Sequence, residues 1–285
     1  MVSHTGAAAV APGAGDIAEV YVTGRDVHNR SLIGRVDIDL SAPEQAPVVA
    51  SSPSLDLGGR GAFDDSGVAY PCLVESDGDL LLFYTGWRQT VTTPFENDLG
   101  RACLGRDGRF ERVSRGPILP RTDADHLGIG STWVRREADR WHMWYTSFFS
   151  WEAGLSGCEH SYGIKYAWST DGLTWQRDDE LCIGPSSNED LSICRPTVWF
   201  DGSTYHMWFC HRGAAYRIGY ASSTDGVMWD RDDAASGLEL GAEGSWDDEA
   251  QCYPCVFERD GEVYLLYAGN DYGRGGLGLA TLVRP

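Results

Sequence analysis

Lysine is almost absent from this chain, and a shortage of basic residues argues against nucleic-acid and membrane partners. Lys165 is the only lysine among the 285 residues, so arginine carries nearly all of the positive charge. The 23 basic residues face 42 acidic ones, which gives a net charge of −19. A surface of this sign repels nucleic acid and anionic lipid, and no basic cluster offsets it. The sequence therefore predicts no nucleic-acid partner and no membrane partner.

Long apolar runs and an export signal are missing as well. A membrane span needs about 20 consecutive apolar residues, and no stretch of this sequence approaches that length. Residues 1–17 are rich in Ala, Gly and Pro, but they lack the basic start and the apolar stretch of a signal peptide. We expect these residues to be disordered or loosely held, and we expect the protein to be cytoplasmic.

The eight cysteines are not spaced as a metal or redox centre. Without a secretion signal, buried thiols are expected rather than disulfides. Cys252 and Cys255 form a CxxC, but no second CxxC supports a site there. The sequence therefore predicts no cofactor and no metal ligands, and the one alternative is a cation bound by acidic groups in a central channel.

What the chain does contain is a nine-residue pattern that occurs four times. Its second and third positions are acidic, except that histidine takes the third position of the second copy, and each copy runs into an apolar stretch. A repeat that places acidic groups at one structural position several times over can focus carboxylates on a single point. The copies are residues 63–71, 124–132, 188–196 and 246–254.

Each copy opens a segment that is typical of antiparallel sheet. A strand, a polar turn and an aromatic second strand follow, and Asp-Gly in such a turn is a strong hairpin signal. With a third strand and a further turn, each repeat predicts the four-stranded antiparallel blade of a β-propeller. The repeats cover residues 63–285, and strands expected at 18–23 and 31–40 add one more unit. We therefore predict an all-β, five-bladed β-propeller as a single domain over residues 18–285, in which an N-terminal strand completes or neighbours the last blade.

Three features carry a resemblance to a known superfamily. They are the acidic residues before each inner strand, the Asp-Gly-x-x-Trp turns at 171–175 and 225–229, and the Met-Trp-aromatic second strands at 143–145 and 207–209. Over residues 18–285 the chain resembles the five-bladed propellers of the glycoside hydrolase superfamily that includes families 32, 43, 62, 68 and 130. In particular, it is similar to uncharacterised family 43-like proteins of bacterial biosynthetic clusters. The Asp-Pro opening motif of families 32 and 43 is not present.

The resemblance implies catalysis by carboxyl groups from different blades: a base, an acid, and a second Asp that tunes a pKa. Aligning the repeats puts Asp65 at the base position and makes Glu249 or Glu189 the acid. Asp190 or Asp125 would tune these groups by like-charge repulsion. The predicted catalytic residues are Asp65, His126, Asp190 and Glu249.

Several predicted site residues have a purely structural alternative. His126 and His211 act as acid, base or metal ligand, or each forms a hydrogen bond with the channel wall. Arg195 binds an anionic substrate, or it neutralises Glu189 and Asp190. The first acidic residue of each copy contributes to the site or caps a turn. The predicted substrate-binding residues are Asp64, Trp87, Arg88, Asp125, Glu189, Arg195, His211, Arg212, Asp248 and Asn270.

Two rim segments, residues 87–98 and 148–162, are expected to be long binding loops whose aromatic side chains stack on a flat ligand. The first functional hypothesis is a carbohydrate-active enzyme that cleaves or transfers a glycosidic bond with channel carboxylates. The second is a non-hydrolytic acid/base enzyme of a polysaccharide or secondary-metabolite pathway, and the third is a ligand-binding propeller without catalysis. In each case the expected partner is a small molecule or a sugar-derived substrate.

Overall fold

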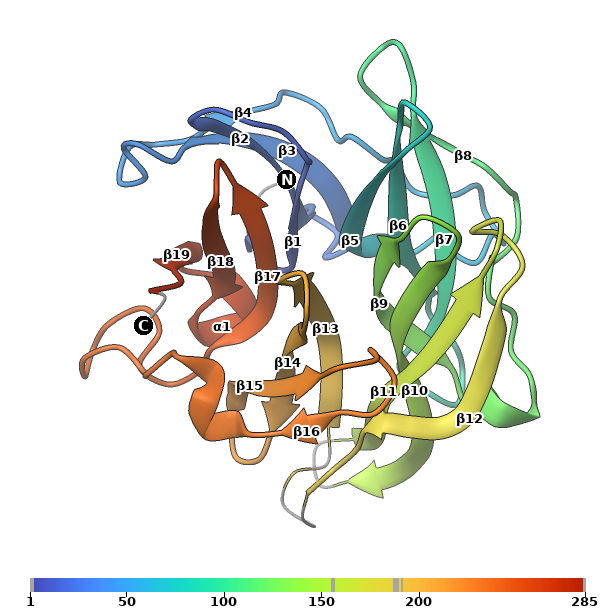
Figure 1. Ribbon diagram of the computed structural model, residues 1–285. Coiled ribbons are helices and arrows are strands. Elements are labelled where there is room, and N and C mark those ends of the chain that lie inside the picture. Colours follow the sequence, from blue (N-terminus) through green and yellow to red (C-terminus); the bar gives the residue numbers. More distant parts are fainter. Residues whose placement is uncertain (1–2, 155–156, 187–189, 191, 284–285) are drawn as a thin grey trace.

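Antiparallel groups of strands radiate from a central axis (Figure 1). The computed structural model describes residues 3–154, 157–186, 190 and 192–283. The first group comprises β1 (Ala8–Val10), β2 (Ile17–Arg25), β3 (Ser31–Asp39) and β4 (Val48–Val49). The second comprises β5 (Gly67–Ser76), β6 (Asp79–Arg88), β7 (Glu96–Leu104) and β8 (Phe110–Arg112). A parallel pairing of Ser31 with Gly67 joins these two groups.

The remaining groups follow in chain order. The third comprises β9 (Ile129–Arg136), β10 (Trp141–Gly154), β11 (Gly157–Ser169) and β12 (Gln176–Ile183). The fourth comprises β13 (Ser192–Phe200), β14 (Tyr205–Arg212), β15 (Tyr216–Ser223) and β16 (Asp230–Arg231). The last comprises β17 (Cys252–Arg259), β18 (Glu262–Ala268) and β19 (Leu277–Thr281). Helix in the described residues is limited to α1 (Asn270–Gly273) and two 3-10 turns, Asp123–Asp125 and Asp233–Ser236.

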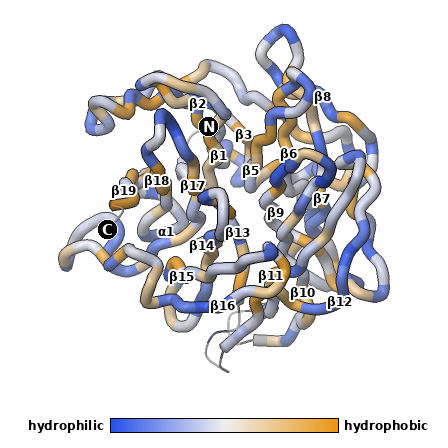
Figure 2. Tube along the Cα trace, in the orientation of Figure 1, coloured by the Kyte–Doolittle hydropathy of each residue, from blue (hydrophilic) through white to orange (hydrophobic). Residues whose placement is uncertain are grey.

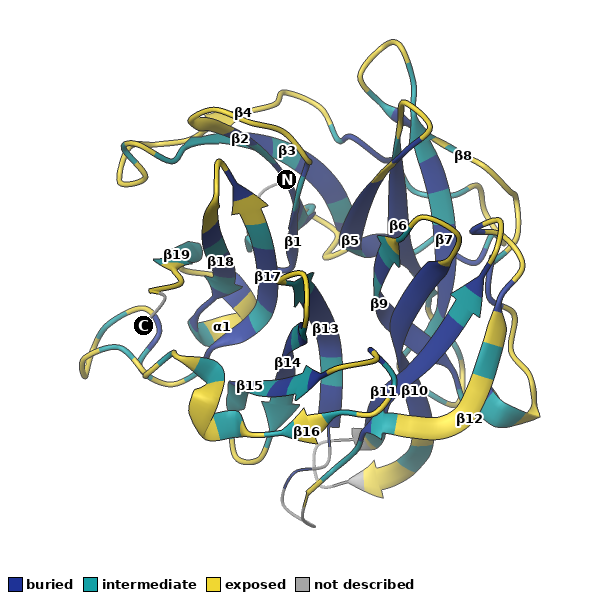
Figure 3. Ribbon diagram, in the orientation of Figure 1, coloured by how far each residue is buried: buried dark blue, intermediate teal, exposed yellow. Residues whose placement is uncertain are grey.

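The first strand of each group lies closest to the axis. These strands contact one another in cyclic order, β1 with β5, β5 with β9, β9 with β13, β13 with β17, and β17 with β1. Buried residues concentrate on the inner and middle strands, whereas β4, β12 and β16 are largely exposed (Figure 3). Figure 2 shows hydrophilic residues along the outer strands β12 and β16. The predicted nearly all-β propeller fold is confirmed.

Asp-Gly turns connect the inner strands to the second strands, as predicted. Asp77 and Gly78 have φ angles of 55° and 86°, and Asp260 and Gly261 have 52° and 84°. Two successive positive φ angles are the type I′ geometry that matches the twist of a hairpin. These tight turns bring the end of each second strand back to the end of the propeller where the inner strand begins.

Aromatic side chains fill the space between neighbouring groups. Trp175 is 9% exposed and packs in one cluster with Phe83 of β6 and Trp141 of β10. The turn before it is held by Asp171, which accepts hydrogen bonds from the backbone N–H groups of Leu173 and Thr174 at 2.8 and 2.7 Å. Burying such a ring contributes roughly 4–6 kcal/mol of transfer free energy. The predicted structural roles of these Asp-Gly-x-x-Trp turns agree with this packing.

The N-terminal residues differ from the prediction of a loose segment. Ala7, Ala8 and Ala9 are each 1% exposed, and β1 pairs with β2 and contacts both β5 and β17. Arg259 of β17 donates hydrogen bonds to backbone carbonyls of this segment, at 3.0 Å to Ala11 and 2.7 Å to Ile17. Small side chains give little hydrophobic signal in a sequence, but they fit the crowded axis where larger ones would clash. The N-terminal strand thus neighbours the last group, one of the two predicted arrangements.

Candidate functional site

A cavity of about 330 Å³ opens at one end of the propeller axis. Inner strands, second strands and the N-terminal segment all contribute to its wall. Its aromatic side chains are Tyr70, Trp87, Phe95, Tyr253 and Tyr272. Its polar side chains are His4, Thr23, Arg25, Ser31, Gln89 and Asn97. We call this the axial cavity; Trp87 is the one predicted site residue that lines it.

Three residues just before prolines turn their side chains toward the axis. Tyr70, Arg195 and Tyr253 have φ angles of 53°, 53° and 58°, which is the left-handed region. Each sits where the register between the inner strand and the second strand shifts. Such a conformation costs a non-glycine residue of order 1–3 kcal/mol and persists only when the surroundings hold it in place.

Side chains of neighbouring groups hold these three positions. The backbone N–H of Tyr70 donates to Thr23 Oγ1, that of Arg195 to Ser131 Oγ, and that of Tyr253 to Cys210 Sγ, each at 3.0 Å. Each acceptor belongs to the preceding group in the chain. The floor of the axial cavity is therefore built jointly by adjacent groups and is held rigidly in place.

Arg195 crosses the channel beneath this floor. It is 0% exposed, and its Nη2 donates to the carbonyl oxygens of Ala8 at 2.6 Å and Pro71 at 2.9 Å. Its Nε and Nη1 have no hydrogen-bond partner. The predicted neutralisation of Asp190 is not what the structure shows, because Asp190 pairs with Arg231 instead. Glu189 lies outside the described residues.

Further tyrosines surround the cavity. Tyr162 and Tyr216 share a hydrogen bond of 2.5 Å between their hydroxyls, and Arg212 lies over the Tyr216 ring at 5.6 Å and donates to Ser192 Oγ at 3.3 Å. Burial raises the pKa of the Tyr70 phenol to about 12. The Tyr70 phenol therefore remains protonated at neutral pH.

Among the described residues, none of the first acidic residues of the repeats lines this cavity. Asp64 is 0% exposed and accepts hydrogen bonds from the Tyr84 hydroxyl at 2.9 Å and Arg112 Nε at 2.8 Å. Asp247 accepts from the Tyr267 hydroxyl at 2.9 Å and from Gln251 at 3.2 Å. These carboxylates tie the segment before an inner strand to the second strand of the same group through side-chain hydrogen bonds, a structural role that differs from the predicted turn cap.

Asp125 occupies the same position in the third group. It is 0% exposed and accepts hydrogen bonds from the Tyr145 hydroxyl at 3.0 Å, Ser147 Oγ at 2.6 Å and Arg177 Nη1 at 2.7 Å, and Lys165 Nζ lies 3.4 Å away. Burial alone would raise its pKa, but these donors outweigh burial and lower the pKa. The only lysine of the chain is thus used inside a closed structural contact.

The second acidic residues mostly cap turns. Asp65 accepts the backbone N–H of Gly61 at 2.8 Å, and Asp248 accepts that of Gly244 at 2.6 Å. Asn270 donates to Asp248 at 2.8 Å and accepts the backbone N–H of Glu249 at 3.0 Å.

The other predicted catalytic residues lie apart from one another. The Glu249 side chain is exposed, and so is that of His126, whose Nδ1 lies 3.1 Å from the carbonyl oxygen of Asp123. None of the four predicted catalytic residues lines the axial cavity in the described part of the chain.

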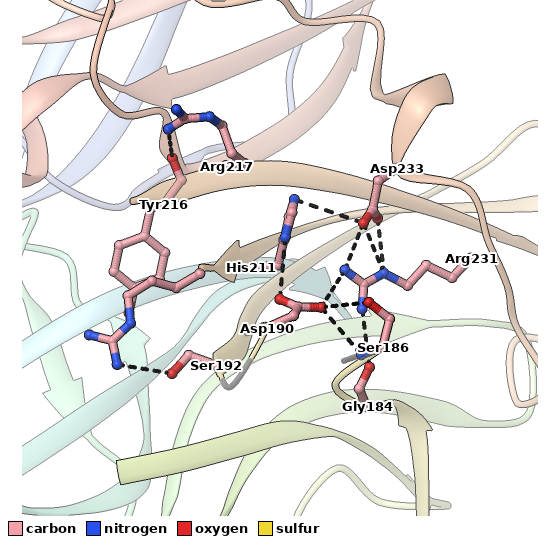
Figure 4. Close-up of polar contacts among 10 residues, drawn as sticks. Gly184, Ser186, Asp190, Ser192, His211, Tyr216, Arg217, Arg231 and Asp233 are labelled. Atoms are coloured by element: carbon pink, nitrogen blue, oxygen red, sulfur yellow. Dashed lines mark hydrogen bonds and ion pairs between the residues drawn. The ribbon is translucent and has the colours of Figure 1, made fainter. Parts of the chain in front are cut away.

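Besides Asp248 and Asn270, a second pair of predicted residues meets, Asp190 and His211 in the fourth group (Figure 4). Asp190 Oδ1 lies 3.3 Å from His211 Nδ1, an ion-pair distance without hydrogen-bond alignment, and His211 Nε2 lies 3.8 Å from Asp233. Arg231 contacts both carboxylates, at 2.8 Å to Asp190 and 2.6 Å to Asp233. This acid–base cluster lines a separate cavity of about 300 Å³, together with Ser186 and Arg217. A histidine between two carboxylates is suited to accept and release a proton.

The sequence analysis missed the arginines that complete these contacts. Arg112, Arg177 and Arg231 lie in the outer strands and pair with Asp64, Asp125 and Asp190. Each follows an aromatic residue by two positions, after Phe110, Trp175 and Trp229. That recurrent aromatic-x-Arg spacing was the signal available in the sequence.

The first rim segment contains a loop at residues 89–95 between β6 and β7, as predicted, whereas the second consists mainly of strands. Residues 148–162 fall largely in the hairpin of β10 and β11, where Phe148, Trp151 and His160 stack against one another. Phe95, which lines the axial cavity, packs on this stack with its ring centroid 5.3 Å from that of Trp151. Burial lowers the pKa of His160 to about 4, so it is neutral at physiological pH.

Glu96, which lies between the cavity-lining residues Phe95 and Asn97 in the chain, is paired with two arginines. Arg88 Nε donates to Glu96 at 2.7 Å, and Arg121 lies 2.9 Å from the same carboxylate. Asp98 is buried beside them, and burial raises its pKa to about 6.

Among the described residues, no group of three or more His, Cys, Asp or Glu side chains is placed to hold a metal ion. None of the helices described is long and apolar enough to cross a membrane.

Comparison with solved structures defines the class of fold. A thermostable family-43 glycoside hydrolase superimposes with a TM-score of 0.76 at 17% identity, covering 100% of this chain and 91% of its own. A glycosyl hydrolase from Bacteroides ovatus gives 0.74 at 14% identity, covering 99% and 85%. A structure of the GH130 family gives 0.72 at 14% identity, covering 98% and 84%. The chain therefore has the propeller fold of these glycoside hydrolases, and the predicted resemblance is confirmed.

Relatives by sequence are mycobacterial. No protein-family model matches the chain. Two uncharacterized proteins of Mycobacterium tuberculosis, Rv1502 of strain H37Rv and MT1551 of strain CDC 1551, are each 39% identical over 268 residues, which is 94% of this chain and 89% of theirs. The chain belongs to the family of these mycobacterial proteins.

Proposed function

We propose that this chain is a carbohydrate-active enzyme with five blades, and that it binds a sugar-derived small molecule in the axial cavity. In this proposal the blades are the groups β1–β4, β5–β8, β9–β12, β13–β16 and β17–β19. The cyclic contacts among their first strands support that number.

The observation that carries the proposal is the aromatic wall of the axial cavity. Trp87, Tyr70 and Tyr253 present flat faces beside hydrogen-bonding groups, which suits the apolar face and the hydroxyl rim of a sugar ring. Its volume of about 330 Å³ lies in the range of small-molecule sites. A neighbour of the same fold, a Bombyx mori β-fructofuranosidase mutant, is described in complex with sucrose.

The lining of the axial cavity favours the non-hydrolytic hypothesis over paired-carboxylate hydrolysis. Glycoside hydrolysis of the common kind needs two carboxyl groups about 5–5.5 Å apart for retention or about 6.5–9.5 Å apart for inversion. Within the described residues the lining includes neither Asp nor Glu. A sugar held there would meet phenol, amide, imidazole and guanidinium groups instead.

A second candidate function, acid–base catalysis at His211, is supported by its own observation. The imidazole is flanked by Asp190 and Asp233 and lines a cavity of its own. In this alternative Asp190 orients the ring and His211 transfers the proton, which is the usual division of labour in such pairs.

Binding and hydrolysis are tested separately. Thermal unfolding with a panel of mono- and disaccharides should show a rise in Tm for at least one sugar, and Trp87→Ala should abolish that rise. Trp168→Ala, on β11 and outside the cavity, is the matched control and should keep it. Absence of any sugar-dependent rise would refute the proposed binding site.

An aryl-glycoside panel tests the reaction class. We expect no turnover. Turnover that is lost in both Asp65→Asn and Glu249→Gln would restore the paired-carboxylate mechanism, and turnover that is lost in His211→Asn would support the second candidate.

A further inference from the structure

We infer that the ligand of the axial cavity carries a negatively charged group, a carboxylate or a phosphate attached to the sugar. This inference rests on the proposed function and deepens it by naming the chemical class of the ligand. It is carried by the distribution of charge around the cavity, and above all by two arginines, Arg25 and Arg195.

The charge of the cavity wall is opposite to that of the whole protein. The chain has a net charge of −19, yet the described residues that line the cavity include no carboxylate and do include Arg25 and His4. Strand alternation explains the exclusion: Phe95 and Asn97 line the cavity, whereas Glu96 between them pairs with Arg88 and Arg121. A neutral ligand would not require acidic side chains to be kept out of this wall.

Arg195 adds positive charge from beneath the floor. Its two hydrogen-bond acceptors, the carbonyls of Ala8 and Pro71, belong to the residues directly after Ala7 and Tyr70, which line the cavity. The guanidinium is 0% exposed, two of its N–H-bearing nitrogens are unpartnered, and no ion pair joins it to a carboxylate of the described residues. A buried charge without a counter-charge is strongly unfavourable, so an anionic group bound above it would offset that cost.

Arg25 is placed to make the direct contact. It ends β2 at the mouth of the cavity, where its Nη1 donates to the Asn29 carbonyl at 2.9 Å and its backbone bridges to Ser3. That anchoring orients the guanidinium, and its Nε and Nη2 form no hydrogen bond with the described residues. A planar guanidinium suits two-point recognition of a carboxylate or a phosphate. In this arrangement Arg25 binds the acidic group directly. Arg195 acts as a positioning residue, because the positive electrostatic potential of its guanidinium attracts the acidic group of the ligand.

The experiment compares matched ligands by calorimetry at constant ionic strength. The probes are glucose, galactose and mannose, their 6-phosphates, the corresponding uronates, and inorganic phosphate and chloride alone. We expect at least one sugar acid or sugar phosphate to bind about tenfold or more tightly than its neutral parent. The uronate and phosphate arms distinguish the two sources of charge.

Variants assign the effect to the arginines. Arg25→Met should remove the preference, so that the charged sugar and its neutral parent bind about equally, whereas Arg109→Met, at a partly buried arginine outside the cavity, should keep the preference. Arg195→Lys retains the charge and should keep the preference, while Arg195→Met should reduce it.

The outcomes separate this inference from the proposed function. Equal or tighter binding of neutral sugars would overturn the charged-ligand inference and leave the sugar site standing. Binding of no sugar, charged or neutral, would overturn the proposed function itself. Binding of inorganic phosphate or chloride alone would show an ion site beneath the floor and would also overturn the inference.

Discussion

The carboxylate that pairs with the outer-strand arginine is fully buried in the third group of strands and lines a cavity in the fourth. Asp125 is 0% exposed and is surrounded by a hydroxyl from Ser147, a phenol and two cations. In the fourth group Asp190 keeps the outer-strand arginine, but His211 takes the place of Ser147 and Asp233 lies on the other side of the imidazole. One type of contact is thus a closed structural contact in the third group and part of a partly buried acid–base cluster in the fourth.

The difference shows how a repeated scaffold acquires a distinct site. An imidazole stands where the third group has a short hydroxyl, and its contact with the carboxylate is longer. The added carboxylate, Asp233, shares Arg231 and lines a cavity of about 300 Å³ with it. Stability is then spread over more groups, and the histidine is left accessible for chemistry.

The largest expected effect is on stability. Asp125→Ala should lower the free energy of unfolding by about 3–5 kcal/mol, because it leaves Arg177 and Lys165 without their buried counter-charge. Asp190→Ala should lower it by only about 1–2 kcal/mol, because Arg231 keeps Asp233. Urea unfolding at neutral pH measures both. Equal losses of unfolding free energy would show that Asp125 and Asp190 contribute equally to stability.

A smaller effect is expected at the position that differs between the groups. Ser147→Ala should cost about 1–2 kcal/mol, since it removes a hydrogen bond from a fully buried carboxylate. His211→Ala should cost less than about 1 kcal/mol, because the imidazole is partly exposed and not aligned with Asp190. The same urea titration measures them, and a larger loss for His211→Ala would contradict its assignment as an accessible acid–base group.

The smallest expected effect is on pH dependence. The folded-state pKa of Asp125 is lowered, so its stabilisation is complete above the ordinary aspartate pKa of about 3.9 and is lost as pH falls through the lower folded value. The stability difference between the wild type and Asp125→Ala should therefore be constant from pH 7 to about pH 5 and narrow below about pH 4. Unfolding curves at several pH values test this, and a difference that widens on acidification would reverse the sign of the argument.

Local patterns in the sequence were sufficient for the strands and turns. Asp-Gly pairs predict hairpins because their backbone preference is local, and the structure has positive φ angles at Asp77 and Asp260 as those turns require. The tryptophan after each Asp-Gly turn likewise predicts packing between groups, as found for Trp175.

Whether each acidic residue lines the channel or is buried in a structural contact was not predictable from local patterns. Whether Asp64 lines a funnel or becomes buried depends on Tyr84 and Arg112, which lie 20 and 48 residues further along the chain. The alanines of β1 posed the same difficulty, since Ala8 meets Arg195, which lies 187 residues further along the chain. Partners at such separations leave no local periodicity for a pattern to report.

The sequence by itself determined the repeating antiparallel unit, the acidic character of the protein and the recurrence of carboxylates before each inner strand, because these follow from local backbone preference and composition. Only the tertiary structure decided which carboxylates are buried in structural contacts and which one meets a histidine. It also decided that the described lining of the axial cavity is aromatic and contains no carboxylate. The physical reason is that burial and pairing are set by side chains that the closed ring of inner strands brings together from distant parts of the chain.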